Sequence, residues 1–595
     1  MNIHPKERFT YLIQAIKLVY YSSPKWTVIN ILTTSLRGFI PLLLLYVVKE
    51  LVDVVAQTVE TNGSNINLTE VYTTVALAGI FFLLNAVSGS INALVRERQA
   101  HFVNDHIQSL IQDKTVNIPY RYFEDANYQD IFYRAINEAP YRPGAIFYSL
   151  LGLLQNLITL GIVIIILSTF HWSLIPVLLL AGVPIILFRF YYSRKLYAIK
   201  KEQTEDERKM HYFNRLLTAK DFAKELRIFN LNDTFRDKYV EVRDRLRAKQ
   251  WQLSKNKTAW ESMVQILSTS VLLIVFSVII LGAIKGEISN GSMAMYFLAL
   301  HRGYAVLQVL LSKITSLYED NLFLKNFFEF QKISLPSEES TKADFPSPLN
   351  NGITFNDVSF KYPNTKRWVF KNINLHIPSG KTIALVGENG SGKTTLVKML
   401  AGLYQPSNGN IKLDNVDINN IKHEELAQNI SVIFQDFMLY NMSASDNIRF
   451  GNVKRPFEAD NIIKAANEAG IHNVFNGLPK GYDTTLGTLF KDSEMLSRGE
   501  WQRTALARSF YNEAQLVILD EPTSSLDAFT EASLIKHFKQ IIHGRTAIIV
   551  SHRLTTISMA DIIVVLKDDG IAEYGEYQHL MQTKGELYRM IESLK

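Results

Sequence analysis

The stretch "IALVGENGSGKTTLVKML" (residues 383–400) decides the fold of the second half of this chain. It begins with a short apolar run, typical of a buried strand, and it ends as a helix, with a glycine-rich loop between the two. The spacing Gly387-Glu-Asn-Gly-Ser-Gly392-Lys393-Thr394 matches the phosphate-binding P-loop in full. A strand, this loop and a helix in that order predict an α/β nucleotide-binding domain.

Each part of the P-loop has a physical task. Gly387, Gly390 and Gly392 let the backbone wrap around phosphate with its N–H groups turned inward, and the helix N-terminus adds a dipole that favours the anion. We expect Lys393 to place its charge on the β- and γ-phosphates and Thr394 to offer its hydroxyl to Mg²⁺. The other nucleotide-binding candidates here are Asn389, Ser391 and Thr395.

A second apolar run, "LVILDEP" (residues 516–522), predicts a buried strand that ends at an acidic pair. Ligands bind at the carboxyl ends of parallel strands, so Asp520 is expected to hold Mg²⁺ there. Glu521 is expected to be the base that polarises the attacking water. The alternative, a surface Asp-Glu pair after an ordinary strand, is disfavoured by the P-loop upstream.

The first half of the chain predicts a membrane domain. The chain has 595 residues, which is too long for a single core, and its long apolar runs lie in the first half. About six stretches approach the roughly 20 apolar residues that a membrane span needs. They lie near Val28–Val55, Glu70–Val95, Ile146–Phe170, Trp172–Tyr192, Met263–Ile284 and Met293–Ile314.

The basic residues predict the orientation of these spans. Lys and Arg are absent from the first two connecting tips, and the third tip, "KGEISNGS", has only Lys285. They are dense in the long connections after the second and fourth spans, which places these connections and both termini in the cytoplasm. The connections could be helices that continue the spans and turn at Arg121–Asp130 and Ala219–Phe229; ordinary cytoplasmic loops are the alternative.

The composition shift predicts the domain boundaries. "ISLPSEESTKADFPSPLNNG" (residues 333–352) is rich in Ser, Pro and charge and is interpreted as a linker between a membrane domain at 1–332 and an ATPase domain at 353–595. Before the first span, Leu12, Ile13, Ile16 and Val19 share one helical face, which suits a helix on the membrane surface; a plain soluble helix is the alternative.

Composition excludes several other functions. The sequence has no cysteine, which removes disulfides, thiolate zinc sites and cysteine nucleophiles. The net charge of +6 is modest, so nucleic-acid binding is not indicated. Within the apolar half, Arg37 is expected either to have a function or to be paired inside the bundle, because intramembrane charge is costly.

The nucleotide half resembles an ABC-transporter ATPase, and the whole chain resembles an exporter-type half-transporter with its membrane domain first. Tyr362 in "VSFKYP" matches the aromatic residue that stacks on adenine, and Gln435 in "VIFQD" matches the glutamine that reaches the metal and the water. His552 in "IIVSHRL" matches the histidine that contacts the γ-phosphate, and Ser524–Asp527 matches the D-loop. The loop Tyr122–Ala135 is similar to that of bacterial peptide exporters.

The family signature LSGGQ appears here as "LSRGEWQR" (residues 496–503). The resemblance implies that the Ser497 hydroxyl and the Gly499 N–H bind the γ-phosphate of a nucleotide on the opposite subunit. Arg498 replaces a glycine and Glu500 replaces the glutamine. Glu500 adds negative charge near a polyanion, and we expect Arg498 and Glu500 to offset each other's charge.

The resemblance implies a dimer of half-transporters, either two copies of this chain or a pair with a different one. Two ATP molecules with Mg²⁺ would be clamped at the interface, and Arg121–Asp130 and Ala219–Phe229 would be coupling helices. The expected activity is ATP-driven export of a peptide, lipid or other amphipathic molecule across a bacterial cytoplasmic membrane. The alternatives are a lipid or glycolipid flippase, an importer, and an ATP-gated channel.

Overall fold

The structure is a computed structural model. It describes residues 5–60, 68–125, 128–129, 131–132, 135–136, 140–333, 343–363, 365–523 and 544–593, together with Glu531, Ile535, Phe538 and Ile542. The chain divides into two compact units. The first comprises Met1–Val116 with Asp130–Ile333, and the second comprises Asn117–Gln129 with Ser334–Lys595. The segment between the second and third predicted spans therefore contributes to both units.

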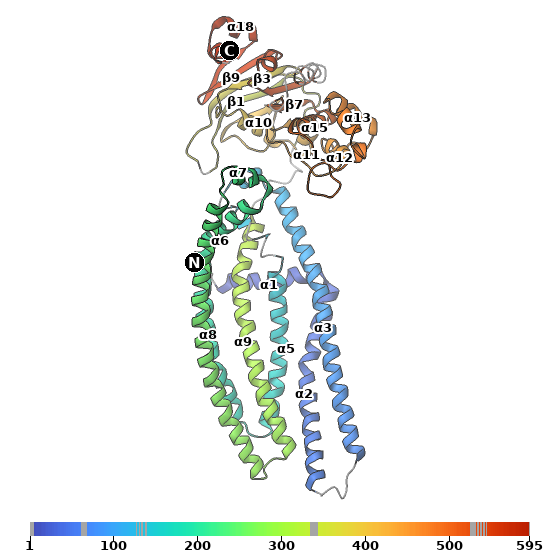
Figure 1. Cartoon of the computed structure of the whole chain (residues 1–595), viewed down its shortest axis with the longest axis vertical. Coiled ribbons are helices and arrows are strands. Elements are labelled where there is room, and N and C mark those ends of the chain that lie inside the picture. The colour runs from blue at the N-terminus through green and yellow to red at the C-terminus, as the bar shows by residue number, and fades with distance from the viewer. Residues whose placement is uncertain are drawn as a thin grey trace. The chain divides into compact units, whose positions relative to one another are not determined.

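The first unit is all helical (Figure 1). In the part of this unit that the structure describes, six long helices contain the predicted spans, and two of them, α2 and α6, contain an internal proline. The helices are α1 (Pro5–Ser22), α2 (Pro24–Glu60), α3 (Leu68–Asn117), α5 (Arg142–Ser168), α6 (Leu174–Thr218), α7 (Ala223–Ile228), α8 (Asn232–Ile284) and α9 (Asn290–Lys332).

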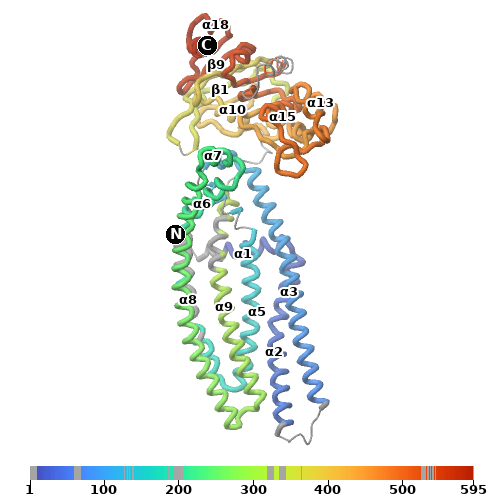
Figure 2. Tube along the Cα trace, viewed as in Figure 1, coloured from blue at the N-terminus to red at the C-terminus, as the bar shows by residue number. Residues whose placement is uncertain are grey.

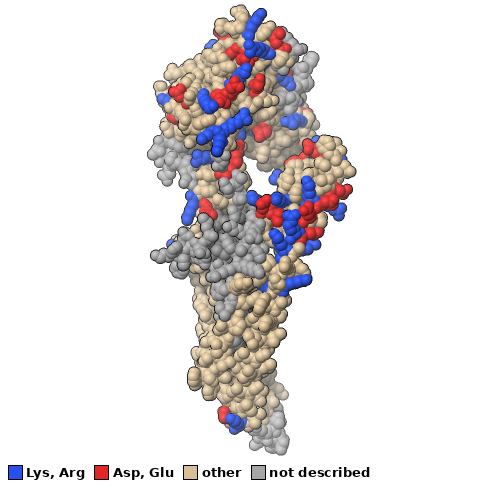
Figure 3. Space-filling view, turned by 90° about the vertical axis from the view of Figure 1, so that its left-hand side faces the viewer, with Lys and Arg blue, Asp and Glu red and all other residues tan. Residues whose placement is uncertain are grey.

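Length and composition agree with a membrane-spanning role. Among the described residues, four helices are long and apolar enough to cross a bilayer, within Thr69–Asn117, Arg142–Ser168, Asn232–Ile284 and Asn290–Leu317. The face of this unit in Figure 3 has a long stretch without charged side chains. The prediction of a helical membrane domain ahead of an α/β domain is confirmed.

The core of the first unit lies where α5 packs against α9 and α8 against α6, and the course of these helices can be followed in Figure 2. Helix α1 packs on α5 and α9, with the Tyr11 ring stacked on Phe328 at 5.4 Å between centroids. Val19 lies on this buried face, whereas Ile13 and Ile16 are exposed. The single apolar face predicted for α1 is therefore divided between packing and an exposed surface.

The second unit contains two sheets. A six-stranded sheet has the order β10-β9-β3-β8-β7-β6 and is parallel except for β10, and a four-stranded antiparallel sheet has the order β2-β1-β4-β5. The strands are β1 (Gly352–Phe360), β2 (Phe370–Pro378), β3 (Thr382–Gly387), β4 (Asn408–Leu413), β5 (Val416–Asp417), β6 (Ile430–Ile433), β7 (Leu516–Asp520), β8 (Thr546–Val550), β9 (Ile562–Lys567) and β10 (Gly570–Gly575).

Helices flank the large sheet and form a separate lobe around α12–α15 (Figure 1). They are α10 (Lys393–Leu400), α11 (His423–Asn429), α12 (Ala444–Arg449), α13 (Ala459–Glu468), α14 (His472–Asn476), α15 (Arg498–Tyr511), α17 (Leu554–Ile557), α18 (Tyr577–Thr583) and α19 (Glu586–Glu592). Strands β3, β7 and β8 are buried along their whole length, which explains their continuous apolar sequences.

The end of the expected linker belongs to the second core. Ala343 bridges to Ile421, and the side chains of Phe345 and Leu349 are buried among the strands. The Ser, Pro and charged residues around these two apolar positions favoured a linker over the whole of 333–352. From residue 343 onward, the segment packs into the core of the second unit and is not a linker, because Phe345 and Leu349 bury their side chains.

Candidate nucleotide site

The P-loop joins the carboxyl end of β3 to helix α10, as its sequence predicts. Gly390 and Gly392 have φ angles of +85° and +94°, which other residues rarely adopt. A Cβ on Gly392 would also lie 2.4 Å from the Phe370 ring. Asn389 is exposed, and the Ser391 hydroxyl is buried without a hydrogen-bond partner among the described residues. The loop thus holds a glycine-dependent shape in which a buried hydroxyl remains available.

Lys393 is held by the loop that it serves. Its Nζ donates to the carbonyl oxygens of Gly387 and Glu388, at 2.7 and 2.9 Å. Burial lowers the pKa of Lys393, and the nearby carboxylates of Glu521 and Asp520 oppose that shift. The ammonium group therefore lies beside the P-loop with opposite charges close by.

Asp520 closes the other side of this site from the end of β7. Strands β3 and β7 lie parallel on either side of β8, so their carboxyl ends share one edge of the sheet. The Thr394 hydroxyl donates to Asp520 Oδ2 at 3.0 Å. Burial raises the pKa of Asp520, although the hydrogen bond from Thr394 counteracts the shift. A hydroxyl and a carboxylate thus meet where the sequence predicted a metal site.

Three further side chains converge on this edge. Gln435 Nε2 donates to Glu521 Oε2 at 2.8 Å, and His552 Nε2 lies 3.9 Å from Glu521 Oε1. The His552 Nε2 atom is buried and has no hydrogen-bond partner in the part of the chain that the structure describes. Burial lowers the pKa of His552 and Lys393 lowers it further, whereas Glu521 opposes the shift. The structure thus brings Gln435, Glu521 and His552 together.

The backbone of Glu521 has an unusual conformation, with φ at +51°. Its N–H donates to the Val550 carbonyl at 2.9 Å, and its carbonyl accepts from Gln502 Nε2 at 3.1 Å. Gln502 is buried and was not among the residues that the sequence singled out. Its position six residues after Leu496 on helix α15 was the available signal. Gln502 therefore links the helix that carries the signature to the backbone of Glu521.

Tyr362 contacts α10, the helix that follows the P-loop. Its hydroxyl is 2.8 Å from the Thr395 hydroxyl, and its ring makes an edge contact with Tyr404 at 5.5 Å between centroids. The aromatic residue predicted for base stacking is therefore tied to α10 near the phosphate-binding loop.

The signature residues begin helix α15 in the separate lobe. Ser497 is its N-cap, and Gly499 lies in its first turn. The hydrogen bonds of Ser497 in the described part of the chain stay within α15, with none to the P-loop. Arg498 and Glu500 form no ion pair in that part, so the expected local charge offset is not observed; Glu500 binds Ser497 instead. Ser524–Asp527, the predicted D-loop, lies outside the described residues.

The short segment Asn117–Gln129 lies in the same unit as this site. Glu124 accepts hydrogen bonds from Lys398 of helix α10, at 3.1 Å, and from the Tyr404 hydroxyl. Tyr120 makes an edge contact with the Tyr404 ring at 5.9 Å. The predicted turn at Arg121–Asp130 contains part of a 3-10 helix over Tyr120–Tyr122, and the second predicted turn contains α7.

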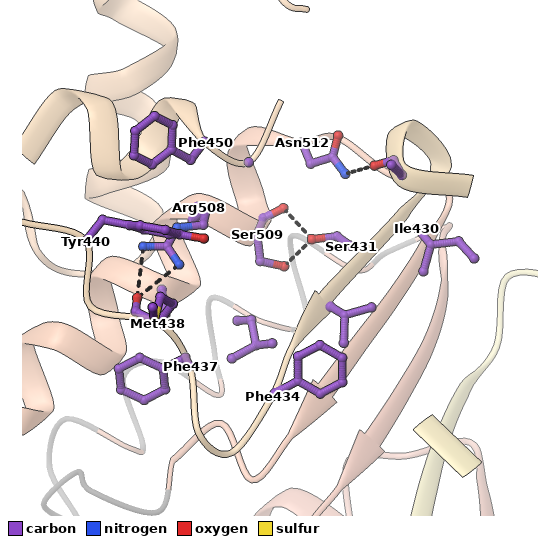
Figure 4. A pocket seen from close by; sticks show the side chains of 15 residues that line it. Ile430, Ser431, Phe434, Phe437, Met438, Tyr440, Phe450, Arg508, Ser509 and Asn512 are labelled. Atoms are coloured by element: carbon purple, nitrogen blue, oxygen red, sulfur yellow. Dashed lines mark hydrogen bonds between the residues drawn. The ribbon is translucent and has the colours of Figure 1, made fainter. Parts of the chain in front are cut away.

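A pocket of about 250 Å³ lies between β6, the segment that follows it, and helix α15 (Figure 4). Phe434, Phe437 and Met438 from the segment after β6 form one wall. Arg508 of α15 donates to the Met438 carbonyl and lies 4.6 Å from the Tyr440 ring centroid. The pocket therefore connects the segment after β6, which carries Gln435, to the helix that begins at the signature.

Comparisons with known proteins agree with this geometry. The model of the ABC transporter family matches residues 370–524, and the model of the ABC transporter transmembrane region matches residues 27–302. The subtilin transport ATP-binding protein SpaT of Bacillus subtilis is 28% identical over 551 residues, covering 92% of this chain and 88% of that protein. The nisin transport ATP-binding protein NisT of Lactococcus lactis subsp. lactis is 26% identical, covering 96% and 94%.

A solved structure shares the fold. The structure of a bacterial Atm1-family ABC exporter with ATP bound superposes with a TM-score of 0.78 at 21% identity, covering 96% of this chain and 98% of that one. Both family models match one continuous chain, in the order membrane region and then ATPase. The chain therefore belongs to the ABC transporters, as an exporter-type half-transporter whose ATP hydrolysis is coupled to transport.

Proposed function

We propose that two such chains share each ATP site and together export an amphipathic cargo. The observation that carries this proposal is the separation of two sets of groups on one chain. Lys393, Asp520 and Glu521 gather at the sheet edge, whereas Ser497 begins α15 and bonds only within that helix in the described residues. A nucleotide on one chain would take its second wall from the α15 N-terminus of the other.

The residues at the sheet edge fit a nucleotide with Mg²⁺. Tyr362 would stack on the base, and the N–H groups of the P-loop together with Lys393 would bind the phosphates. The Thr394 hydroxyl, the Asp520 carboxylate and the Gln435 amide are hard oxygen donors of the kind that Mg²⁺ prefers. When bound, the ion would neutralise charge on the phosphate oxygens.

Hydrolysis would depend on the orientation of Glu521. Gln435 holds its carboxylate and Gln502 holds its backbone, so that the carboxylate can accept a proton from water. His552 Nε2 has no hydrogen-bond partner among the described residues and would contact the γ-phosphate. A positioned base contributes typically about 10²–10⁴ in rate.

Coupling to the membrane domain would use two surfaces. The segment Asn117–Gln129 lies against the P-loop helix through Glu124. The second surface would be the predicted coupling segment Ala219–Phe229, which contains helix α7. Because ATP would bind the closed dimer more tightly than the open one, it would shift the population toward closure and turn the cargo cavity outward.

The candidate cargo and the expected membrane are inferred from the similar proteins. SpaT and NisT match nearly the whole chain, so an amphipathic peptide is our first candidate, and the bacterial cytoplasmic membrane is the expected location. A lipid flippase is the second candidate, since an ATP-dependent lipid A-core flippase of Chromobacterium violaceum is 26% identical over 521 residues. Because P-loop and signature lie on one chain, a homodimer can supply both complete sites.

The direct test is the ATPase rate of the purified full-length Glu521→Gln variant. We expect a loss of at least about a hundred-fold with ATP binding retained. Glu424→Gln is the matched control, because Glu424 is a surface carboxylate paired with Lys454 on the same unit. Undiminished turnover in Glu521→Gln, or an equal loss in the control, would refute the assigned role.

A further inference from the structure

Two arginines of the membrane unit, Arg37 on α2 and Arg96 on α3, have no counter-charge among the residues that the structure describes. Neither guanidinium makes a hydrogen bond or an ion pair within the described part of the chain, and the Nε atom of each is buried without a partner. Arg37 lies against Gly89 of α3, seven residues before Arg96 on the same helix. Two partly buried like charges in one region repel each other unless an anion lies between them.

The arginines belong to a polar seam between α2 and α3. Asn30 donates to Gln99 at 2.6 Å, Gln99 donates to Thr27 at 2.9 Å, and Asn92 donates to Thr34 at 2.9 Å. Every one of these five side chains finds a partner inside the seam.

Arg37 comes one turn after Thr34, and Arg96 lies between Asn92 and Gln99, so both continue the same helical faces. The seam provides hydrogen-bond partners for its neutral members, whereas its two cations have no ion-pair partner in the described residues.

The neighbouring backbone and an aromatic ring contact both arginines, which are half-buried. A Cβ on Gly89 would lie 3.5 Å from Arg37 Nη2, so this guanidinium lies against the bare backbone of α3. The guanidinium of Arg96 is 5.8 Å from the ring centroid of Tyr148 on α5, whose hydroxyl donates to the Arg96 carbonyl at 3.0 Å. Since both Nε atoms are buried, neither side chain is simply extended toward lipid.

The depth of the pair indicates which leaflet it faces. Arg37 is roughly 23 residues, or about 35 Å, from the end of α2 at Glu60, and Arg96 is roughly 28 residues, or about 42 Å, from the start of α3 at Leu68. The hydrocarbon core is about 30 Å thick. With the α2–α3 tip outside, as the basic residues predict, the pair lies at the level of the cytoplasmic headgroups.

We propose that Arg37 and Arg96 bind the anionic headgroup, phosphate or carboxylate, of an amphipathic molecule that enters from the cytoplasmic leaflet. A guanidinium presents a planar fork of donors that matches the oxygens of either group. The bound anion would replace the missing counter-charge and cancel the repulsion between the two cations. The identification of this molecule as cargo rests on the proposed export function, whereas its binding to the two arginines does not depend on that function.

The test compares lipid binding without ATP. The full-length protein is placed in vesicles of dioleoylphosphatidylcholine, and electron paramagnetic resonance measures its preference for spin-labelled phosphatidylglycerol over spin-labelled phosphatidylcholine. We expect the wild-type protein to prefer phosphatidylglycerol, and Arg37→Gln and Arg96→Gln each to reduce that preference about five-fold. If the ATPase function failed but this preference remained, only the link to transport would be lost.

Arg98→Gln is the matched control, because Arg98 is exposed on the same helix with its guanidinium 5.1 Å from the Phe102 ring centroid. It removes the same charge and should leave the preference near the wild-type value. An unchanged preference in the Arg37→Gln/Arg96→Gln double variant, or an equal loss in Arg98→Gln, would overturn the proposal. If inorganic phosphate at matched ionic strength abolished the preference, the site would take small anions and the amphipathic part would be wrong.

Discussion

The Glu500 carboxylate accepts a hydrogen bond from the backbone N–H of Ser497, with 2.7 Å between Oε2 and N. In return, the Ser497 hydroxyl oxygen accepts one from the N–H of Glu500 at 3.3 Å. This reciprocal capping box satisfies two N–H groups at the start of α15 and leaves those of Arg498 and Gly499 free for an anion. The Ser497 hydroxyl also keeps its own proton to donate.

The capping box predicts that Glu500→Gln is well tolerated. Glutamine can make the same backward hydrogen bond, so we expect the ATPase rate to change by less than about ten-fold. Glu500→Ala loses that bond and should destabilise the ATPase domain by about 1 kcal/mol and slow turnover. Steady-state ATPase assays and thermal unfolding followed by tryptophan fluorescence measure both effects. A Glu500→Gln variant as impaired as Glu500→Ala would contradict this role.

The burial of Asp520 predicts that its carboxylate lowers the folding stability of the protein although ATPase activity requires it. Burial raises its pKa above the value in the unfolded chain, so the ionised carboxylate costs stability at neutral pH. Asp520→Asn should therefore raise the unfolding temperature of the nucleotide-free protein at pH 7–8, while ATPase activity is lost. The stability difference should shrink as the pH falls through the folded pKa toward the unfolded one, because Asp520 is then protonated in both states.

Thermal scans over this pH range check the prediction for Asp520. The control is Asp569→Asn, which removes an exposed carboxylate that pairs with Lys371 at 2.7 Å. It should lower the unfolding temperature slightly or leave it unchanged. A lower unfolding temperature for Asp520→Asn at neutral pH would show that the buried carboxylate stabilises the fold.

The contact between Glu124 and Lys398 predicts that this pair transmits closure of the ATP-bound dimer to the membrane domain. Burial alone would raise the pKa of Glu124, but hydrogen bonds from Tyr404 and Lys398 outweigh it and hold the pKa below its usual value. The stabilisation is therefore present above the unfolded pKa and is lost as the pH falls through the folded pKa. Glu124→Lys should reduce transport more than ATPase activity, since the catalytic groups remain in place.

A charge exchange tests this pair. The double variant Glu124→Lys/Lys398→Glu restores opposite charges and should recover part of the transport measured in inside-out vesicles. Lys454→Glu is a suitable control, because Lys454 pairs with Glu424 on the surface. Equal loss of transport and ATPase activity in Glu124→Lys, with no recovery in the double variant, would rule out a coupling role.

Sequence alone predicts the parts of the site that depend on local spacing. The P-loop between β3 and α10, and Asp520 at the end of β7, follow from short patterns and from the geometry of parallel strands. The spacing of Ser497 and Glu500 also fits a capping box, although the sequence favoured a charge offset between Arg498 and Glu500. A local hydrogen bond to the backbone replaces that expected pairing.

The remaining features depend on contacts between distant segments. Glu124 and Lys398 are 274 residues apart, and no local pattern identifies them as partners. The contact between Gln502 and the Glu521 carbonyl likewise requires the lobe around α15 to pack on the sheet. Arg37 was expected to be functional or paired, and only the three-dimensional arrangement leaves it without an ionic partner in the described residues.

The central claim is that the signature of one chain completes the ATP site of another. Because the sequence has no cysteine, Glu388→Cys in the P-loop and Arg498→Cys in the signature can be introduced together without background reaction. In a Glu521→Gln background, a short bis-maleimide should link two chains into a covalent dimer when ATP is bound, and much less without it. If ATP left the two chains unlinked, or if the link formed only within one chain, the shared site would be contradicted.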